Sequence, residues 1–182
     1  NPNGGSYAES KLKGEELVKD SSLKWVILRP SEVFGPNSPD AINKLIRLIR
    51  GFVVVPVVGD GTYKLSPAYV DDVIEVMGRC ILNPDLDGKT WVLSGPETMS
   101  FAELVDRICR FLQVRRFKVF IPVFLAKWAI ELLIFLGTDF LVRDQIPRML
   151  CDKNHDQAFR PPNYHPRTLE QGLSQFLGND RL

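Results

Sequence analysis

The sequence has few cysteines, few histidines and almost no excess of charge of either sign. Its three cysteines, Cys80, Cys109 and Cys151, are odd in number and widely spaced, which excludes a disulfide framework and a CxxC metal knuckle. With 23 Lys and Arg against 22 Asp and Glu, the formal net charge is +1, so we expect no general electrostatic binding of nucleic acid. Unpaired thiols favour a reducing compartment, and we expect the protein in the cytoplasm.

Two further features are missing from the sequence. No GxGxxG phosphate-binding loop occurs in it, and residues 1–5 have neither the basic region nor the apolar run of a signal peptide. Loop-like residues lead directly into a predicted helix, without the usual first strand. We therefore expect the chain to be part of a larger α/β protein.

In other respects the 182 residues are typical of a globular protein, with 45% hydrophobic and 25% charged side chains. Hydrophobic periodicity and turn signals predict an alternation of helices and strands, which indicates the α/β or α+β class. The expected helices are 7–19, 41–50, 70–81, 101–112, 122–136, a short one near Asp144 and one from 169 onwards. The expected strands are 23–29, 52–58, one running from the Gly59-Asp60-Gly61 turn towards Tyr69, and 91–93.

The helix ends and two of the strands give finer expectations. Asp40 is predicted to be an N-cap, and capping boxes are predicted to begin at Ser100 and Thr168. Strands 23–29 and 91–93 are apolar enough to belong to a buried parallel sheet. Because such a sheet needs more than two strands, we expect unpaired strand edges and self-association of this chain.

Tyr7 and Lys11 are four residues apart on the first predicted helix, so their side chains would project from one face. An ammonium group beside a phenol favours the phenolate and lowers the tyrosine pKa from about 10 towards neutrality. Such a tyrosine can act as a general acid or base on a hydroxyl or carbonyl group. The spacing also occurs by chance, and the alternative is an exposed tyrosine beside a solvated lysine.

Further motifs follow this pair in a set order. They are YAESK at 7–11, LRPSEVFGP at 28–36, GDG at 59–61 and YVDDV at 69–73. On these residues the chain resembles the C-terminal part of an extended or atypical short-chain dehydrogenase/reductase, in the NAD-dependent epimerase/dehydratase superfamily. The resemblance implies an α/β fold made of the second half of a Rossmann-like, doubly wound domain and a small α/β substrate-side domain, without the N-terminal cofactor half.

The same resemblance implies roles for particular residues. Tyr7 would be the catalytic acid/base, and Lys11 would hold the nicotinamide ribose and lower the Tyr7 pKa. Pro30 and the loop through Val33 would lie against the nicotinamide of NAD or NADP in the intact parent protein. The two implied domains interleave along the chain, with 1–36 and 71–96 in the Rossmann-like domain and 37–70 and 97–182 in the substrate-side domain.

Two positions on the substrate side depart from the nucleotide-sugar epimerases that the chain resembles. Those enzymes often carry Asn in place of Glu32 and Arg in place of Leu65, and both residues help to hold a diphosphate. A carboxylate repels a diphosphate, and an aliphatic side chain cannot bind one. Lys64 would be a substitute, but its side chain should point to the opposite face of the strand. We therefore expect a small-molecule substrate other than a nucleotide sugar.

Within the superfamily, the chain resembles an atypical branch similar to the NADPH-binding accessory subunit of respiratory complex I. This resemblance depends on PAYVDDV, GKTWVLSGPETMSFAELV, DQIPRML and the ending PRTLEQGL. Two functions stay open. The parent is either an NAD(P)-dependent oxidoreductase or epimerase-like enzyme, inactive as this fragment alone, or a non-catalytic NAD(P)H-binding accessory or scaffold subunit of a complex like NADH:ubiquinone oxidoreductase.

Residues 117–137 form the most apolar stretch and are just long enough to cross a bilayer. Lys118, Lys127, Glu131 and Pro122 argue against a membrane span, because charges at the centre of a membrane are costly. We expect a helix that covers a core or an apolar substrate cleft. The alternative is peripheral contact with a membrane, or a lipophilic substrate such as a quinone or an isoprenoid.

The remaining candidates have simpler interpretations. Asp71 and Asp72 begin a predicted helix, where carboxylates interact favourably with the helix dipole. His155 and His165 lack further ligands at suitable spacing, so no metal is expected. Cys80 and Cys109 fall on apolar helix faces and are expected to pack in the core.

Overall fold

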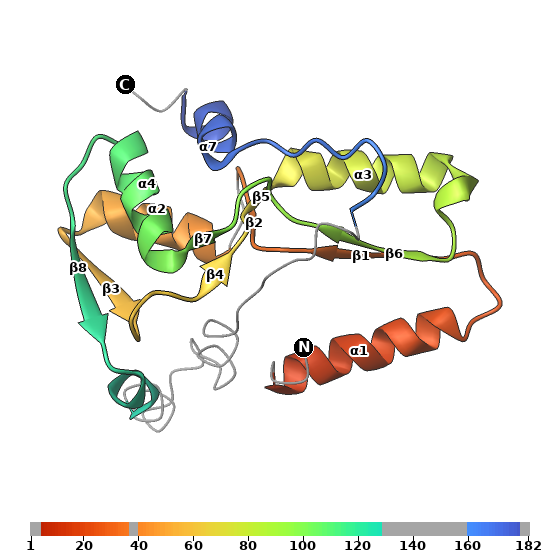
Figure 1. Cartoon of the computed structure of the whole chain (residues 1–182), viewed down its shortest axis with the longest axis horizontal. Helices are drawn as coiled ribbons and strands as arrows, with labels where there is room; N and C mark the ends of the chain where they lie inside the picture. Colours follow the sequence, from red (N-terminus) through yellow and green to blue (C-terminus); the bar gives the residue numbers. More distant parts are fainter. Residues whose placement is uncertain (1–4, 37–39, 129–159, 179–182) are drawn as a thin grey trace.

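A computed structural model gives the three-dimensional structure and describes residues 5–36, 40–128 and 160–178. Helices alternate with short strands along the chain (Figure 1). The elements are α1 (Gly5–Lys19), β1 (Val26–Pro30), β2 (Val33–Phe34), α2 (Ala41–Gly51), β3 (Val54–Val58), β4 (Lys64–Leu65), β5 (Ala68–Tyr69), α3 (Val70–Leu82), the 3-10 helix η2 (Pro84–Leu86), β6 (Lys89–Leu93), β7 (Met99–Ser100), α4 (Phe101–Phe111), β8 (Phe117–Ile121) and α7 (Leu169–Leu177).

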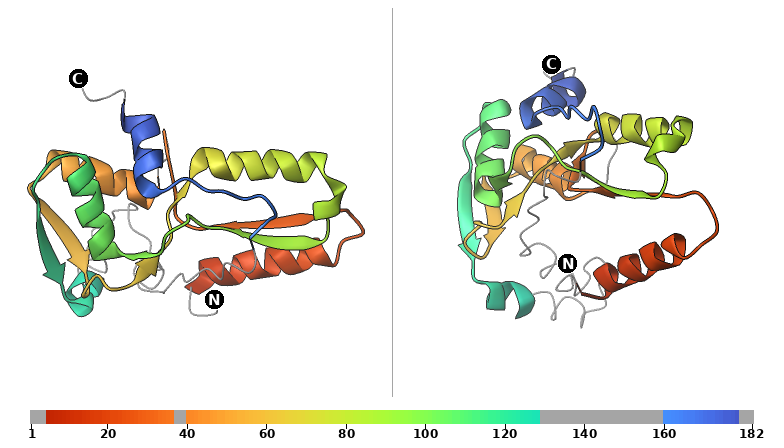
Figure 2. Two further views of the ribbon diagram at one scale, coloured as in Figure 1. Left: turned by 45° about the horizontal axis from the view of Figure 1, so that its top comes forward. Right: turned by 45° about the vertical axis from the view of Figure 1, so that its right-hand side comes forward.

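β1 and β6 form a parallel pair, with Val26 opposite Lys89 and Pro30 opposite Leu93. The sequence predicted strands of one parallel sheet here, and this is confirmed, although β1 begins at Val26 and not at residue 23. Figures 1 and 2 show α3 on one side of the pair and α1 on the other. Helices on both sides of parallel strands are characteristic of a doubly wound α/β fold, which confirms the predicted class.

β3 and β8 form a second parallel pair, from Val54 opposite Phe117 to Val58 opposite Ile121. One face of this pair is covered by α2 and α4 (Figure 1), and Val55 is completely buried there. The sequence predicted β3 but did not separate β8 from the apolar stretch that follows it. β8 has only five residues and is followed almost directly by helical residues. Hydrophobic periodicity alone does not distinguish so short an apolar strand from the beginning of an apolar helix.

The larger hydrophobic core lies between α2, β3, α4 and α7. Its largest fully buried members are Phe34, Ile49, Val55, Leu104, Val105, Ile108, Leu169 and Leu173. A smaller core lies between α3 and the ends of β5 and β6, and consists of Ala68, Val73, Val76, Leu93 and Tyr164. Cys109 belongs to the larger core and Cys80 packs against the smaller one, as expected.

Three details of the predicted elements need correction. The strand expected before Tyr69 is two short strands, because β4 pairs with β7 and β5 with β2 on either side of the Ser66–Pro67 corner. Asp40 is at the N-cap of α2, but its side chain makes no capping hydrogen bond. Ile81 continues the apolar spacing of α3 and yet is 83% exposed, since this helix buries only a narrow stripe.

The other helix caps follow the prediction. The Ser100 hydroxyl accepts a hydrogen bond from the Glu103 N–H (3.1 Å), and Thr168 forms a complete capping box with Gln171. Of the expected helix 122–136, residues 123–128 are helical and the rest lies outside the described residues, as do the helix near Asp144, Cys151 and His155. Within the described ranges, no helix is both long and apolar enough to span a bilayer.

Candidate functional site

The carboxyl ends of β1 and β6 lie side by side, because the two strands are parallel and in register. The N–H of Ser31, directly after β1, donates to the carbonyl of Leu93 at the end of β6 (3.0 Å). In doubly wound folds, ligands bind outside the carboxyl ends of the strands. The loops that follow β1 and β6 therefore frame the candidate site.

The Ser66–Pro67 corner holds these two loops together. The Ser31 hydroxyl (2.5 Å) and the Gly95 N–H (3.1 Å) both donate to the Ser66 carbonyl. A Cβ on Gly95 would lie 1.8 Å from the Pro67 carbonyl oxygen, so no residue larger than glycine fits there. The contact explains why a glycine follows Ser94 at the end of this strand.

Arg160 also contacts this edge of the sheet, and the sequence analysis did not single it out. Its guanidinium donates from Nη2 to the Ser94 hydroxyl (2.9 Å) and to the Gly95 carbonyl (2.6 Å). These contacts span more than sixty residues of sequence, so neither periodicity nor a local motif could have indicated them. The guanidinium fixes the loop after β6 against the segment that leads to α7.

Tyr7 and Lys11 lie one helical turn apart near the beginning of α1. α1 runs back along the β1–β6 pair, so its N-terminal end lies at the same end of the pair as the carboxyl ends of the strands (Figures 1 and 2). Arg29 on β1 ties this helix to the strand through two bonds to Glu15, of 2.8 and 2.5 Å. The pairing holds the pKa of the Glu15 carboxyl below its ordinary value. The N-terminal end of α1, which carries both residues of the YxxxK motif, is thus at the same end of the strand pair as the candidate site.

Pro30 and Val33 lie on either side of the loop after β1. Pro30 ends β1 and is exposed, whereas Val33 pairs with Ala68 in the short β2–β5 ladder and packs against the smaller core. The N–H of Ala68 also donates to the carbonyl of Glu32 (2.9 Å). The loop is thereby fixed by main-chain bonds, with Pro30 accessible to a ligand at the carboxyl edge.

The charge of Glu32, in the loop after β1, acts on the phenol of Tyr63. Burial raises the pKa of the Tyr63 phenol, and the negative charge of Glu32 raises this pKa further. Among the described residues, the Tyr63 hydroxyl has no hydrogen-bond partner, while its ring stacks on Phe101 with centroids 5.2 Å apart. The sequence motifs predicted Glu32, Lys64 and Leu65 as substrate-side residues and did not indicate Tyr63.

Lys64 and Leu65 point to opposite sides of β4, as strand alternation requires. Leu65 is buried in the larger core, and Lys64 is exposed. β4 pairs with β7 in antiparallel register, with Lys64 opposite Ser100 and Leu65 opposite Met99. The expectation that Lys64 faces away from the position of Leu65 is confirmed.

Asp72 has a tertiary role in addition to its place in the first turn of α3. Its carboxylate accepts from the Arg167 N–H (2.8 Å) and forms an ion pair with the Arg167 guanidinium. Burial raises the pKa of Asp72, and Arg167 opposes that shift. Within the described ranges, no cluster of three or more His, Cys, Asp or Glu residues is placed to hold a metal ion, and His165 is exposed.

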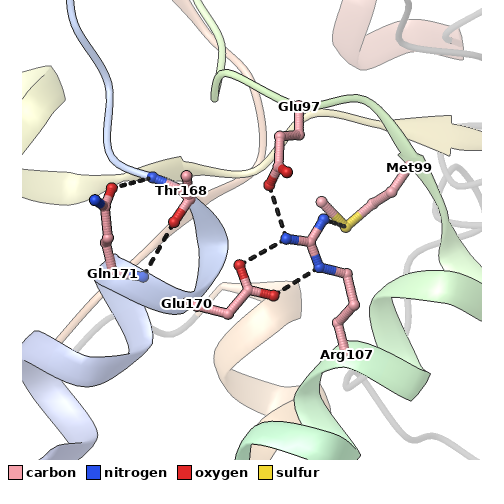
Figure 3. Close-up of polar contacts among 6 residues, drawn as sticks. All are labelled: Glu97, Met99, Arg107, Thr168, Glu170 and Gln171. Atoms are coloured by element: carbon pink, nitrogen blue, oxygen red, sulfur yellow. Dashed lines mark hydrogen bonds and ion pairs between the residues drawn. The ribbon is translucent and has the colours of Figure 1, made fainter.

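A second polar cluster joins α4 to α7 and to Glu97 in the loop after β6 (Figure 3). Arg107 donates to both carboxylate oxygens of Glu170 (2.7 and 2.6 Å) and to Glu97 (2.8 Å). The guanidinium holds the pKa of Glu170 below its ordinary value, because the ionised carboxylate accepts both bonds. The cluster fixes α7, which carries Leu169 and Leu173, onto the larger core.

Comparison with known families identifies a match over most of the chain. Residues 1–128 match the family model of the RmlD substrate-binding domain. A solved structure, a dTDP-4-dehydrorhamnose reductase from Bacillus anthracis in complex with NADP, has a similar fold, with a TM-score of 0.63 at 20% identity over 95% of this chain and 55% of that one.

Three characterised relatives have related sequences. UDP-glucose 4-epimerase of Vibrio cholerae is 26% identical over 180 residues, which cover 93% of this chain and 52% of that protein. The mitochondrial subunit 9 of the NADH dehydrogenase (ubiquinone) 1 alpha subcomplex of Mus musculus is 30% identical over 65% of this chain and 31% of that protein. The 2-alkyl-3-oxoalkanoate reductase of Shewanella oneidensis is 27% identical over 56% of this chain and 30% of that protein. The chain thus spans about half, or less, of the length of these relatives.

Proposed function

The chain belongs to the family of the RmlD substrate-binding domain, within the NAD(P)-dependent epimerase/dehydratase superfamily, and from this premise we propose that it supplies the Tyr–Lys helix and the substrate side of an NAD(P)-dependent reductase or epimerase-like enzyme. The observation that supports this most directly is the direction of α1, whose N-terminal end, with Tyr7 and Lys11, is at the same end of the β1–β6 pair as the carboxyl ends of the strands. A tyrosine in this place can exchange a proton with an oxygen of a substrate bound above the strand ends.

The residues present fit the nicotinamide end of NAD or NADP. Pro30 and Lys11 are both exposed at or near the open strand ends, where the nicotinamide ring and its ribose would lie. When bound, the cofactor accepts or supplies a hydride. Lys11 would bind the ribose and, through its positive charge, favour the ionised form of Tyr7. Tyr7 would move the proton that accompanies hydride transfer, at the substrate oxygen.

The substrate in this proposal is a lipophilic carbonyl compound and not a nucleotide sugar. The Glu32 carboxylate repels a diphosphate, and Leu65 is committed to the core, so neither can bind one. Lys64 points away from Leu65 and does not replace the missing arginine. The relative from Shewanella, whose name describes a reductase of an alkylated oxoalkanoate, provides a precedent for a lipophilic carbonyl substrate in this superfamily.

The second candidate function is a non-catalytic NAD(P)H-binding subunit of a complex like NADH:ubiquinone oxidoreductase. The similarity to subunit 9, at 30% identity, favours it. The two functions make opposite predictions for Tyr7. In an enzyme, Tyr7 acts in the reaction, whereas in a scaffold only binding through Lys11 and the Pro30 loop would matter.

The test uses the full-length protein that contains this chain, assayed for NADPH or NADH oxidation with quinones, long-chain oxo acids and UDP-sugars. The Tyr7→Phe variant should lose roughly 10²–10⁴-fold in kcat while NADPH binding is retained, because only the proton transfer is removed. Lys13→Gln, a substitution on the same helix outside the YxxxK motif, is the control and should leave kcat unchanged. If a UDP-sugar raises the melting temperature and turns over, the substrate proposal is wrong; if no carbonyl compound is reduced while NADPH binds, the scaffold function holds.

A further inference from the structure

The β3–β8 pair has one face that no described element covers. Strand alternation and the parallel register place six side chains on it: Val54, Pro56, Val58, Phe117, Val119 and Ile121. All six are apolar, while Val55 and Val57 point the other way and are completely buried under α2 and α4. We call these six residues the β3–β8 outer face.

The β3–β8 outer face is exposed to solvent. Phe117 is 71% exposed, Val119 48% and Val54 46%. Phe52 and Val53, directly before β3, are also exposed. Beyond β8, the helical residues 123–128 add further exposed apolar side chains, Phe124, Leu125 and Trp128. Several apolar side chains exposed on one face of a strand pair indicate a contact with another apolar phase or molecule.

The charges beside this face have one sign. β3 and β8 are parallel, so the residues that precede them, Arg50, Arg115 and Arg116, lie at the same edge of the pair. Arg116 is held at the end of α2 by a bond from its Nε to the Ile49 carbonyl (2.6 Å). Residues 50–58 and 113–128, which build the face and its edges, contain no Asp or Glu.

This combination fits a lipid surface better than a second copy of the chain. Aromatic and aliphatic side chains beside a basic edge are typical of proteins that lie in the interface of a membrane with anionic lipids. In a dimer formed through the same face, the basic edge of each copy would meet the same face of the second copy. That face contains no Asp or Glu, so no negative charge would compensate the arginines. Anionic headgroups supply that charge.

We propose that the β3–β8 outer face docks on the surface of a bilayer that contains anionic lipid, with the basic edge of Arg50, Arg115 and Arg116 at the headgroups. The protein lies on the membrane through this face and does not cross it. Tyr7 and Lys11 are on α1 and are not part of the β3–β8 outer face, so the docking does not depend on the proposed enzymatic activity.

The experiment measures binding of the purified chain to sedimenting vesicles of phosphatidylcholine alone, and of phosphatidylcholine with an equal amount of phosphatidylglycerol. The wild-type chain should bind the anionic vesicles and bind neutral ones weakly. Val119→Asp should weaken binding by more than about tenfold, because a charge replaces an apolar group at the centre of the face. Ile81→Asp, which changes an exposed isoleucine on α3, should bind like the wild type.

A charge series tests the basic edge. Arg115→Gln should weaken binding to the anionic vesicles by about fivefold, as expected for one basic residue near a charged membrane surface, while Lys13→Gln should have no effect. Far-UV circular dichroism and thermal melting check that each variant folds. Val119→Asn replaces Val119→Asp if the aspartate prevents folding, with the same expected direction.

Three results would overturn the proposal. The first is wild-type binding that does not distinguish the two vesicle compositions. The second is unchanged vesicle binding by Val119→Asp. The third is a wild-type dimer, seen by light scattering, that Val119→Asp dissociates while no vesicle binding occurs; this would assign the β3–β8 outer face to contacts between copies of the chain.

Discussion

The two parallel strand pairs of this molecule adjoin hydrophobic cores of very different size. The β3–β8 pair is backed by α2 and α4, and the larger hydrophobic core lies against it. The β1–β6 pair lies between α1 and α3 and shares only the smaller core. Large apolar side chains around it remain exposed, among them Leu17 on α1 and Ile74, Ile81 and Leu82 on α3.

The residues with proposed chemistry belong to the region with the smaller core. Tyr7 and Lys11 are on α1 and Pro30 ends β1, whereas the larger core contains none of them. The larger core therefore stabilises the β3–β8 region. The β1–β6 region depends on additional contacts to bury its apolar surface and pair its strand edges. Each prediction below tests this difference, from the largest expected effect to the smallest.

The largest expected effect is on the oligomeric state. β1 and β6 pair only with each other among the described residues, so each has an edge available for pairing with another strand. We expect the chain to self-associate, with a molar mass near twice 20.6 kDa or higher. Size exclusion with light scattering measures this mass. A monodisperse, well-folded monomer would show that the two-stranded pair is stable alone.

The second effect concerns the larger core. Ile108→Ala removes a completely buried side chain and should lower the free energy of unfolding by about 2–5 kcal/mol. Ile81→Ala, on the exposed side of α3, should change it by less than about 0.5 kcal/mol. Urea denaturation followed by circular dichroism gives both values. Equal losses would mean that α3 is covered in solution, for example by a second copy.

The third effect concerns the junction of α4 and α7. Arg107→Ala should cost about 1–2 kcal/mol, less than for a fully buried pair, because the Glu170 side chain is 44% exposed. In the folded protein the Glu170 pKa lies below its ordinary value of 4.5, so the stabilisation is complete above pH 4.5 and decreases as the pH falls further.

Denaturation of the wild type and of Arg107→Ala at a series of pH values measures this difference. The two curves should converge in acid. Lys13→Ala, which removes an exposed positive charge on α1, is the control and should leave the pH profile unchanged. A constant difference between wild type and Arg107→Ala at all pH values would mean that lost packing, and not the ion pair, accounts for the effect.

The smallest effect is expected for the contact that ties α1 to β1. Arg29→Ala removes both bonds to Glu15, but the Arg29 side chain is 46% exposed, so the loss of global stability should be only about 0.2–1 kcal/mol. Hydrogen exchange should nevertheless become faster in α1 while α2 and α4 are unaffected. Faster exchange throughout the chain would show that the two regions unfold together.

Much of the local structure follows from short stretches of sequence. The helical spacing of Ile42, Leu45, Ile46 and Ile49 predicted α2, and the Thr168–Gln171 pattern predicted a capping box that forms completely. The YxxxK spacing placed Tyr7 and Lys11 on one helix, since it depends only on 3.6 residues per turn. These features are local, and the physical rule for each needs only a few neighbouring residues.

Other features were decided by contacts between distant segments. Arg160 reaches Ser94 and Gly95, Arg167 reaches Asp72, and Arg107 reaches Glu170, and none of these pairs has a signal in the local sequence. Ile81 has the spacing of a buried residue and is exposed, because the elements packed against α3 cover only part of its apolar surface.

The amino-acid sequence by itself determined the helices, the buried strands, the family resemblance and the pair Tyr7–Lys11, because each depends on short-range periodicity or on a motif. Only the tertiary structure decided which strands pair, which apolar faces remain exposed and where the carboxyl ends of β1 and β6 meet the loop after Pro30. The reason is that strand pairing and burial are made between segments far apart in the chain, and their outcome depends on all of those segments together.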